Sequence, residues 1–161
     1  MTPRALLPLV LAAALSAGCG PTVEIEKTLK LVDVHTGWYD AGIVNGNQNK
    51  LVPSLSFTLQ NTAARPVTGV QLNAIFRRVG EMEVWGEHFA GAIGSDGLAA
   101  GATSRLIVMR SKLGYTGTEP RTQILQNSRF VDARVDVFGK QGRRNWVKLG
   151  AFPINRQLLT Q

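Results

Sequence analysis

The chain has 161 residues, 44% of them hydrophobic, and its 18 lysines and arginines against 11 acidic residues give a formal net charge of +7. The chain has a single cysteine, so we expect no intrachain disulfide, no thiolate metal site and no cysteine catalysis. Residues 101–161 hold 11 of the basic residues and only 3 acidic ones. In a cytosolic protein this balance would favour nucleic acid as the partner, whereas behind an export signal it favours anionic lipid, acidic polymer or acidic protein.

The first 18 residues have the three-part pattern of an export signal. Arg4 supplies the positive start, residues 5–14 are apolar, and small residues follow. The apolar run is shorter than the roughly 20 residues that a membrane-spanning helix needs. We therefore expect residues 1–18 to be a cleaved signal peptide.

Five residues at its end resemble the lipobox of bacterial lipoprotein signal peptides: Leu15, Ser16, Ala17, Gly18 and Cys19. In that family the small residues fit the signal peptidase and the cysteine thiol accepts a diacylglyceryl group. The family usually has leucine where this chain has Ser16. The resemblance implies a lipidated Cys19, a tether over residues 19–22 and an exported domain over residues 23–161. The alternative is a plain secretory leader.

Gly20 follows the cysteine. In lipoproteins of two-membrane bacteria, Asp at this place retains the protein in the inner membrane. The resemblance therefore implies the cell envelope as the location, at the outer membrane and facing the periplasm. It also implies two partners, which are the membrane, through the lipid on Cys19, and an envelope protein; we expect no nucleic acid and no cofactor.

From residue 23 onward the dominant pattern is period-two alternation, which is typical of strands. Residues 23–40 predict one long or bent strand, and residues 42–49 predict a polar turn. Two clean alternations follow, over residues 51–60 and 70–77. We expect these two strands to pair with their apolar faces on one core.

Residues 84–93 predict a further strand, and residues 103–110, which are apolar on both faces, predict a central covered strand. Residues 114–126 are the one helix candidate, because Thr118 can cap the helix and Pro120 tolerates a first turn.

Residues 130–138 give the clearest strand of the chain. Val135 and its period-two neighbours form one apolar face, and Asp136 and its period-two neighbours form a charged face. After a turn, residues 145–154 return as a strand that Pro153 confines to a sheet edge. The pattern as a whole predicts an all-β fold, a single antiparallel immunoglobulin-like β-sandwich of about seven strands with at most one short helix.

A second pattern covers about residues 51–110. It consists of a strand that ends at Asn61, a turn, a strand that ends at Phe76 and a Leu-Ala-Ala-Gly loop at residues 98–101. The pattern resembles the small immunoglobulin-like domains called FxLYD and their late-embryogenesis-abundant relatives. Those families have proline where this chain has Ala100, and Tyr-Asp where it has Phe76-Arg77. The resemblance implies an immunoglobulin-like fold with a binding or structural role and brings no catalytic residues.

No catalytic or metal-binding constellation assembles in the sequence. His35 and His88 lie far apart and lack the spacing of a ligand pair. Ser95 lacks the first glycine of a hydrolase nucleophile elbow. The glutamates between positions 81 and 87 are more typical of a solvated strand face than of a carboxylate pair. We therefore expect no metal site and no enzyme.

The candidate binding residues lie in one hairpin and its returning strand: Lys140, Arg143, Arg144, Trp146 and Lys148. Trp146 and Lys148 share a face by period two, so a cation and a ring can meet a headgroup, a sugar phosphate or an acidic peptide. The alternative is that Trp146 is a core residue and the bases only solvate the turn. Trp38 and Tyr39 form a second aromatic candidate.

Two functions remain open. The first is a non-catalytic, membrane-anchored accessory or scaffold protein whose β-sandwich binds an envelope protein. The second is a binding module for an anionic envelope ligand, such as a lipid headgroup, lipopolysaccharide or an acidic polymer, that uses the basic C-terminal part. Charge-driven ligand binding weakens steeply with salt, whereas docking through apolar surface does not.

Overall fold

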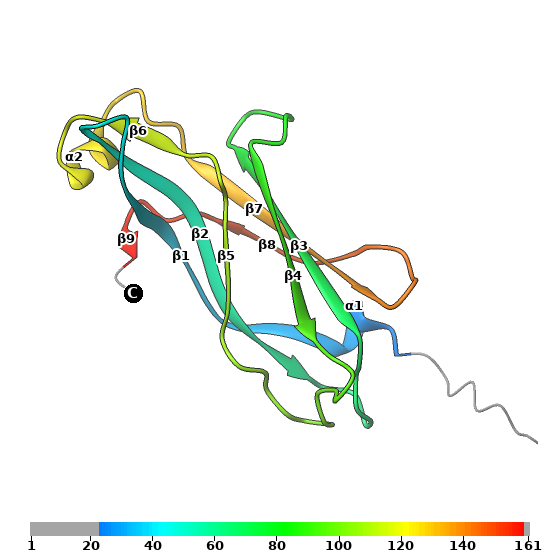
Figure 1. Ribbon diagram of the computed structural model, residues 1–161. Helices are drawn as coiled ribbons and strands as arrows, with labels where there is room; N and C mark the ends of the chain where they lie inside the picture. The colour runs from blue at the N-terminus through cyan, green and yellow to red at the C-terminus, as the bar shows by residue number, and fades with distance from the viewer. Residues whose placement is uncertain (1–22, 160–161) are drawn as a thin grey trace, which may run out of the picture.

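The computed structural model describes residues 23–159, so the expected signal peptide, the tether and Cys19 lie outside the described residues. Two β-sheets pack face to face (Figure 1). The first sheet contains β1 (Leu29–Val44), β2 (Gln48–Asn61), β5 (Ile107–Arg110), β6 (Tyr115–Gly117) and β9 (Leu158–Leu159). The second sheet contains β3 (Val70–Arg78), β4 (Gly86–Ile93), β7 (Ala133–Gln141) and β8 (Val147–Pro153). Two short helices accompany them, α1 (Ile25–Thr28) and α2 (Arg121–Gln126).

The strand order is β5-β2-β1-β9 in the first sheet, with β6 also beside β2, and β4-β3-β7-β8 in the second. All pairings are antiparallel except that of β1 with β9. Among the described strands, seven have four residues or more. The predicted fold class is therefore confirmed, an all-β antiparallel sandwich with immunoglobulin-like strand order.

The core lies between the facing sides of the two sheets. Leu55 and Phe57 of β2 meet Phe76 of β3 and Val135 and Val137 of β7, and all five are fully buried. Burial of such a side chain stabilises the fold by about 1.5–3 kcal/mol. Alternation in β2, β3 and β7 places these residues on one face, as the sequence predicts. Because the buried residues of this core run from Val23 to Ile154, a chain that begins at residue 20 contains all of it.

The strand predicted over residues 23–40 begins only at Leu29, because the preceding residues form the helical turn α1. The backbone N–H groups of Lys27 and Thr28 donate to the carbonyl of Glu24, and the Thr28 hydroxyl donates to it as well. Ile25 is buried from this turn. Alternation over six residues did not distinguish a strand from one helical turn with a buried residue.

The predicted pairing of the strands near residues 51–60 and 70–77 is wrong, because β2 and β3 lie in opposite sheets. The connection over residues 62–69 crosses from one sheet to the other, and it is longer than the two to five residues of a typical hairpin loop. Both arrangements bury the same apolar faces, so alternation alone could not decide between them.

Two further expectations are corrected. The strand at residues 103–110 is not central, because β5 lies at the edge of its sheet and pairs only with β2. Leu106, just before β5, is 60% exposed, and Val108 within β5 is 37% exposed. The helix candidate shortens to α2, which has Pro120 and not Thr118 at its N-cap and lacks a side-chain capping bond. With α1, the described chain has two short helices where at most one was expected.

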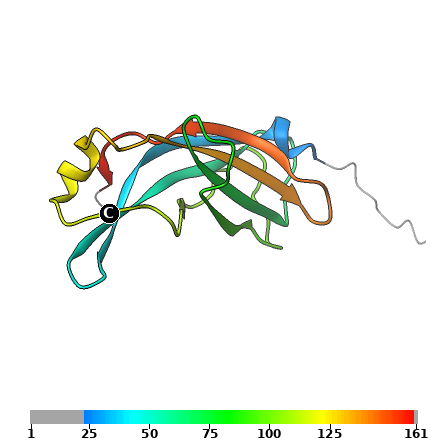
Figure 2. The same ribbon diagram turned by 90° about the horizontal axis from the view of Figure 1, so that it is seen from above.

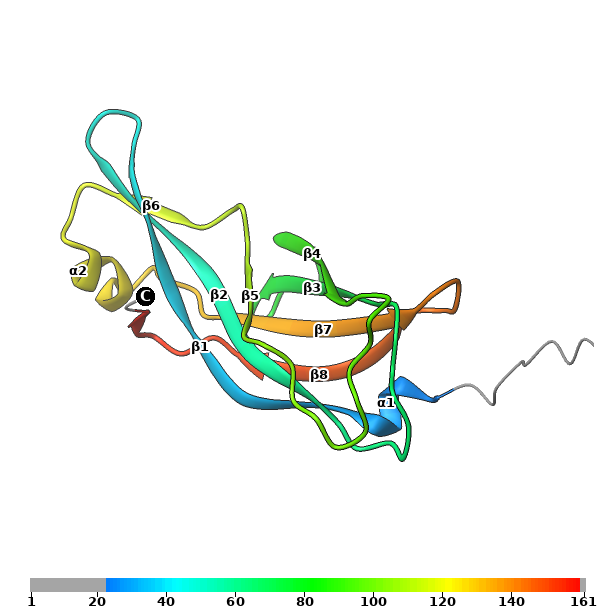
Figure 3. The same cartoon turned by 60° about the horizontal axis from the view of Figure 1, so that its bottom comes forward.

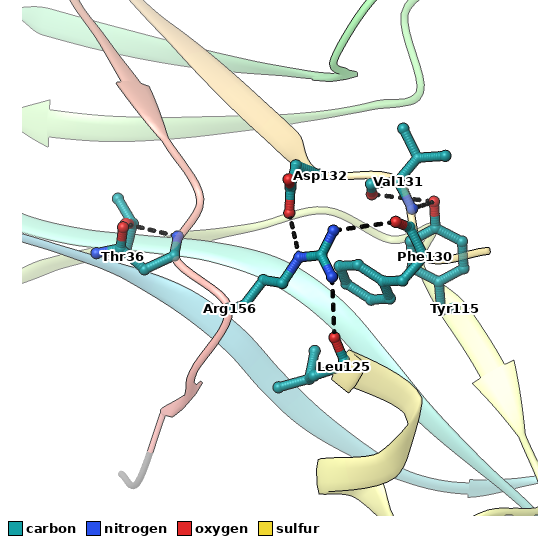
Figure 4. Close-up of polar contacts among 8 residues, drawn as sticks. Thr36, Tyr115, Leu125, Phe130, Val131, Asp132 and Arg156 are labelled. Atoms are coloured by element: carbon teal, nitrogen blue, oxygen red, sulfur yellow. Dashed lines mark hydrogen bonds and ion pairs between the residues drawn. The ribbon is translucent and has the colours of Figure 1, made fainter. Parts of the chain in front are cut away.

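The end of the sandwich that carries α2 is held together by aromatic packing and by Arg156. Trp38, Trp85, Tyr115 and Phe130 form a cluster of neighbouring rings. Arg156 donates to Asp132 Oδ1 at 2.6 Å, to the Leu125 carbonyl at 3.3 Å and to the Phe130 carbonyl at 3.1 Å (Figure 4). The opposite end of the molecule carries α1 and the turn between β7 and β8 (Figures 1 and 2).

Candidate functional site

The five predicted binding residues divide between two neighbouring surfaces at the β7–β8 hairpin. Lys140, Trp146 and Lys148 lie on the outer face of the second sheet. Arg143 and Arg144 lie in the turn between β7 and β8 and line a groove with residues of α1. This turn and α1 lie at the same end of the molecule (Figure 3). The structure therefore brings these residues into one region but does not form a single pocket from them.

Three aromatic rings lie on the outer face of the second sheet. Phe89 of β4 and Phe138 of β7 are both register partners of Asn73 in β3. Trp146 folds onto the same face, and its ring centroid lies 6.1 Å from that of Phe89 in an edge-on arrangement. Phe89 is 59% exposed and Trp146 38% exposed, so Trp146 is not a core residue. We call Phe89, Phe138, Trp146, Lys140 and Lys148 the aromatic face.

The charges on this face have different partners. Lys140 Nζ lies 5.1 Å from the Trp146 ring centroid, so it is Lys140 and not Lys148 that forms the cation–π contact. Lys148 Nζ lies 2.6 Å from Asp136, whose second carboxylate oxygen is 2.9 Å from Arg77. Lys140 makes no ion pair with any described residue. The cation beside the exposed ring is therefore available to an acidic group.

The turn between β7 and β8 borders a groove of about 430 Å³. Arg143 and Arg144 line it together with Val23 and Glu26, and Arg144 Nη1 donates to the Val23 carbonyl at 3.4 Å. The hydrogen bond and the charge of Lys27, with a smaller effect from Arg144, lower the pKa of Glu24. The groove where the described chain enters the sandwich is thus lined by two arginines and one glutamate.

The two residues of the second aromatic candidate, Trp38 and Tyr39, do not form one surface site. Trp38 is fully buried in the aromatic cluster, and Tyr39 lies under the guanidinium of Arg110 at 3.5 Å from the ring centroid. The sequence analysis missed Phe89, because the facing of residues 84–93 is ambiguous. The available signal was the pair of small residues that follows Phe89, which leaves space around an exposed ring.

The two histidines lie in different sheets, His35 in β1 and His88 in β4. His35 is exposed, whereas His88 Nδ1 lies 3.0 Å from the carbonyl oxygen and 3.1 Å from the amide nitrogen of Arg110, and so connects β4 to β5 across the two sheets. Residues 23–159 contain no group of three metal-ligating side chains. None of the helices in that range has the length and hydropathy to cross a membrane.

Comparison of the chain with protein families, with curated proteins and with solved structures returns no match. The resemblances to lipoproteins and to FxLYD domains therefore stay predictions. The class that the structure itself defines is a β-sandwich with an exposed aromatic face and a basic turn at one end.

Proposed function

We propose that this protein is a bacterial envelope lipoprotein, anchored through Cys19 at the outer membrane and facing the periplasm, whose sandwich serves as a non-catalytic accessory or scaffold by binding an envelope protein. The observation that carries the proposal is the aromatic face. Phe89 and Trp146 expose ring surface to water next to the unpaired cation of Lys140.

Surfaces with this composition favour a protein partner. Phe and Trp are enriched in protein interfaces, and a few aromatic anchors supply most of the binding energy. The sheet beneath the rings is held by backbone pairing of β3 with β4 and of β3 with β7, so the anchors are presented on a rigid support. Lys140 beside the rings makes an acidic partner surface the best match.

The site of chain entry supports the anchored arrangement. Val23 is four residues beyond Cys19, which limits the separation of the two residues to about 14 Å in an extended tether. Val23 contacts Arg144 of the β7–β8 turn. A lipid on Cys19 would therefore hold this end of the sandwich close to the headgroups and leave the outer face of the second sheet open to a neighbouring protein.

Photo-crosslinking in intact cells tests the partner. A photoreactive residue replaces Phe89 or Trp146 in the aromatic face, and replaces Ile43 as a control, because Ile43 is 67% exposed but lies on the other sheet. We expect one discrete adduct from positions 89 and 146 that Lys140→Glu weakens. An absence of adducts, or the same adducts from position 43, would contradict a partner at the aromatic face.

An anionic ligand is the second candidate, favoured by Arg143 and Arg144 at the groove beside Val23. The test is co-sedimentation of the chain from residue 20 with phosphatidylglycerol or phosphatidylcholine vesicles at low and moderate salt. We expect binding to the anionic vesicles only, weakened by salt and lost in Arg143→Glu/Arg144→Glu. The matched control is Arg65→Glu/Arg105→Glu, which changes the charge equally at exposed positions elsewhere. Equal loss in both double variants would mean that net charge, and not this turn, governs binding.

A further inference from the structure

A separate groove lies on the outer face of the first sheet, away from the aromatic face. It has a volume of about 480 Å³, and residues of β1, β2, β5 and β9 line it. The floor is formed by small side chains of β2, Ser54 and Ser56. A groove of this size is within the range of small-molecule sites.

The walls of the groove are formed by β9 on one side and by β5 and the residue before it on the other. On one side, β9 pairs with β1, and the Leu159 side chain occupies the space where a Cβ on Gly37 would lie, at 2.8 Å. Glycine at this position therefore allows the C-terminal strand to sit against the sheet. On the other side, Leu106 and Val108 project from the edge strand and its approach.

The charge in the groove is positive. The guanidinium carbon of Arg110 lies over the Tyr39 ring, 3.5 Å from its centroid, and Arg110 forms no ion pair with any described residue. The lining contains no aspartate or glutamate, and His35 is its only other basic side chain. An anion that enters the groove therefore meets one permanent positive charge and no like charge.

Two buried polar atoms at the groove have no hydrogen-bond partner among the described residues. They are the hydroxyl of Ser54, a residue that is only 1% exposed, and Nε of Arg110. Buried polar groups are normally satisfied, and leaving one unpaired is destabilising. Ser54 and Arg110 are register partners on neighbouring strands, so an acceptor oxygen of a ligand placed between their side chains would satisfy both donors.

The rest of the lining is apolar. Leu106 is 60% exposed and Val108 37% exposed, and Leu158 and Leu159 form the facing wall. Exposed leucine and valine next to a cation match a molecule with an apolar chain and a charged head. A single arginine balances one negative charge, as on a carboxylate, whereas a phosphomonoester carries about −1.5 to −2. Arginine also binds a carboxylate through paired hydrogen bonds.

We propose that this groove binds a small monoanionic amphiphile, a carboxylate with an apolar chain of medium length. Arg110 and the Ser54 hydroxyl take the carboxylate, and the chain lies between the walls of Leu106 and Val108 and of Leu158 and Leu159. This site is independent of the aromatic face and of any lipid on Cys19.

The test uses the chain from residue 20, labelled with nitrogen-15, and octanoate as the probe. We expect octanoate to shift the backbone amides of Ser54, Ser56 and Arg110, and octanol, which lacks the charge, to bind at least about tenfold more weakly. Arg110→Gln should weaken octanoate binding by about tenfold or more, and Arg110→Lys by less. Arg105→Gln, an exposed arginine outside the groove, should change nothing.

Several outcomes would overturn the proposal. These are equal affinity for octanoate and octanol, shifts confined to other parts of the sandwich, or undiminished binding in an Arg110→Gln variant that melts like the wild type. Tighter binding of octyl phosphate than of octanoate would overturn the assignment of a carboxylate. The comparison of octanoate with octanol uses the wild-type chain, so it decides the question even if Arg110→Gln does not fold.

Discussion

Asp136 lies on the outer face of β7, yet its side chain is only 8% exposed because Arg77 and Lys148 cover it. Asp136→Asn would remove the charge and leave both cations without their partner. We expect a loss of about 2 kcal/mol in the free energy of unfolding, measured by urea denaturation. Asp33→Asn is the control, because Asp33 is exposed at φ 53°, a conformation that asparagine tolerates. Equal midpoints for the two variants would show that the ion pairs contribute nothing.

Val135 is the neighbour of Asp136 on the opposite face of the strand and is fully buried. Val135→Asp would bury an unpaired charge, which should cost several kcal/mol and unfold a domain of ordinary stability. Circular dichroism of the variant should show the loss of the thermal transition. A cooperative transition near that of the wild type would refute the facing of β7.

Sequence reasoning located these two residues only in part. Alternation places Val135 inside and Asp136 outside, because the two faces of a strand differ by one residue. It gave no sign that Asp136 is covered. One partner, Arg77, comes from β3, which is distant in sequence, and the other, Lys148, lies opposite Phe138 in the β7–β8 pairing and reaches Asp136 only diagonally. A strand face that alternation assigns to solvent therefore contains a nearly buried ion-pair network.

At the scale of elements, the passage from β5 to β6 depends on a close backbone approach at Gly114. A Cβ there would lie 2.0 Å from the Leu51 carbonyl oxygen, a group of the backbone that cannot move aside freely. We expect Gly114→Ala to lower the melting temperature by several degrees or more. Gly91→Ala is the matched control, because nothing lies within 4 Å of its Cβ and the new side chain fits a strand. Similar melting temperatures for both variants would contradict this packing.

The start of α2 is tied to β1 by the ion pair of Arg121 with Asp40. The hydrogen bond from Arg121, with that from the Gly42 amide, holds the pKa of Asp40 below its usual 3.8. A lowered folded-state pKa means that this contribution is complete above pH 3.8 and is lost as the pH falls through the lower folded value. Between pH 5 and pH 3 the wild type should therefore lose slightly more stability than Asp40→Asn, by less than about 1 kcal/mol because the pair is partly exposed. An identical pH dependence of the two proteins in urea denaturation would show that the ion pair of Asp40 with Arg121 does not contribute to stability.

Element prediction succeeded where the alternation was long and failed where a shorter pattern had two explanations. The strands β2, β3 and β7 were expected close to their observed bounds. β5 was expected to be central because both faces are apolar, but its outer face lines the groove at Arg110. Leu106 and Val108, the apolar residues for which the sequence predicted burial, are exposed and line the candidate binding groove.

At the scale of the whole molecule, the two ends of the sandwich differ in what they contain. One end has the aromatic cluster fixed by Arg156, and the other has α1, the basic turn and the point where the described chain begins. The sequence could predict the class of fold and the basic hairpin, because both follow from local pattern. It could not predict that the hairpin lies beside Val23 or that Phe89 meets Trp146, because both contacts depend on the packing of distant segments.

The measurement that tests the central claim most directly is metabolic labelling with a radioactive fatty acid, followed by fractionation of the cells, for the wild-type protein and for Cys19→Ser. A lipid-anchored envelope protein should carry the label and sediment with the outer membrane. Cys19→Ser should carry no label and leave the membrane fraction, while its sandwich, which contains the complete core beyond Val23, stays folded. A wild-type protein without label, or a Cys19→Ser variant that still carries it, would contradict the anchored arrangement.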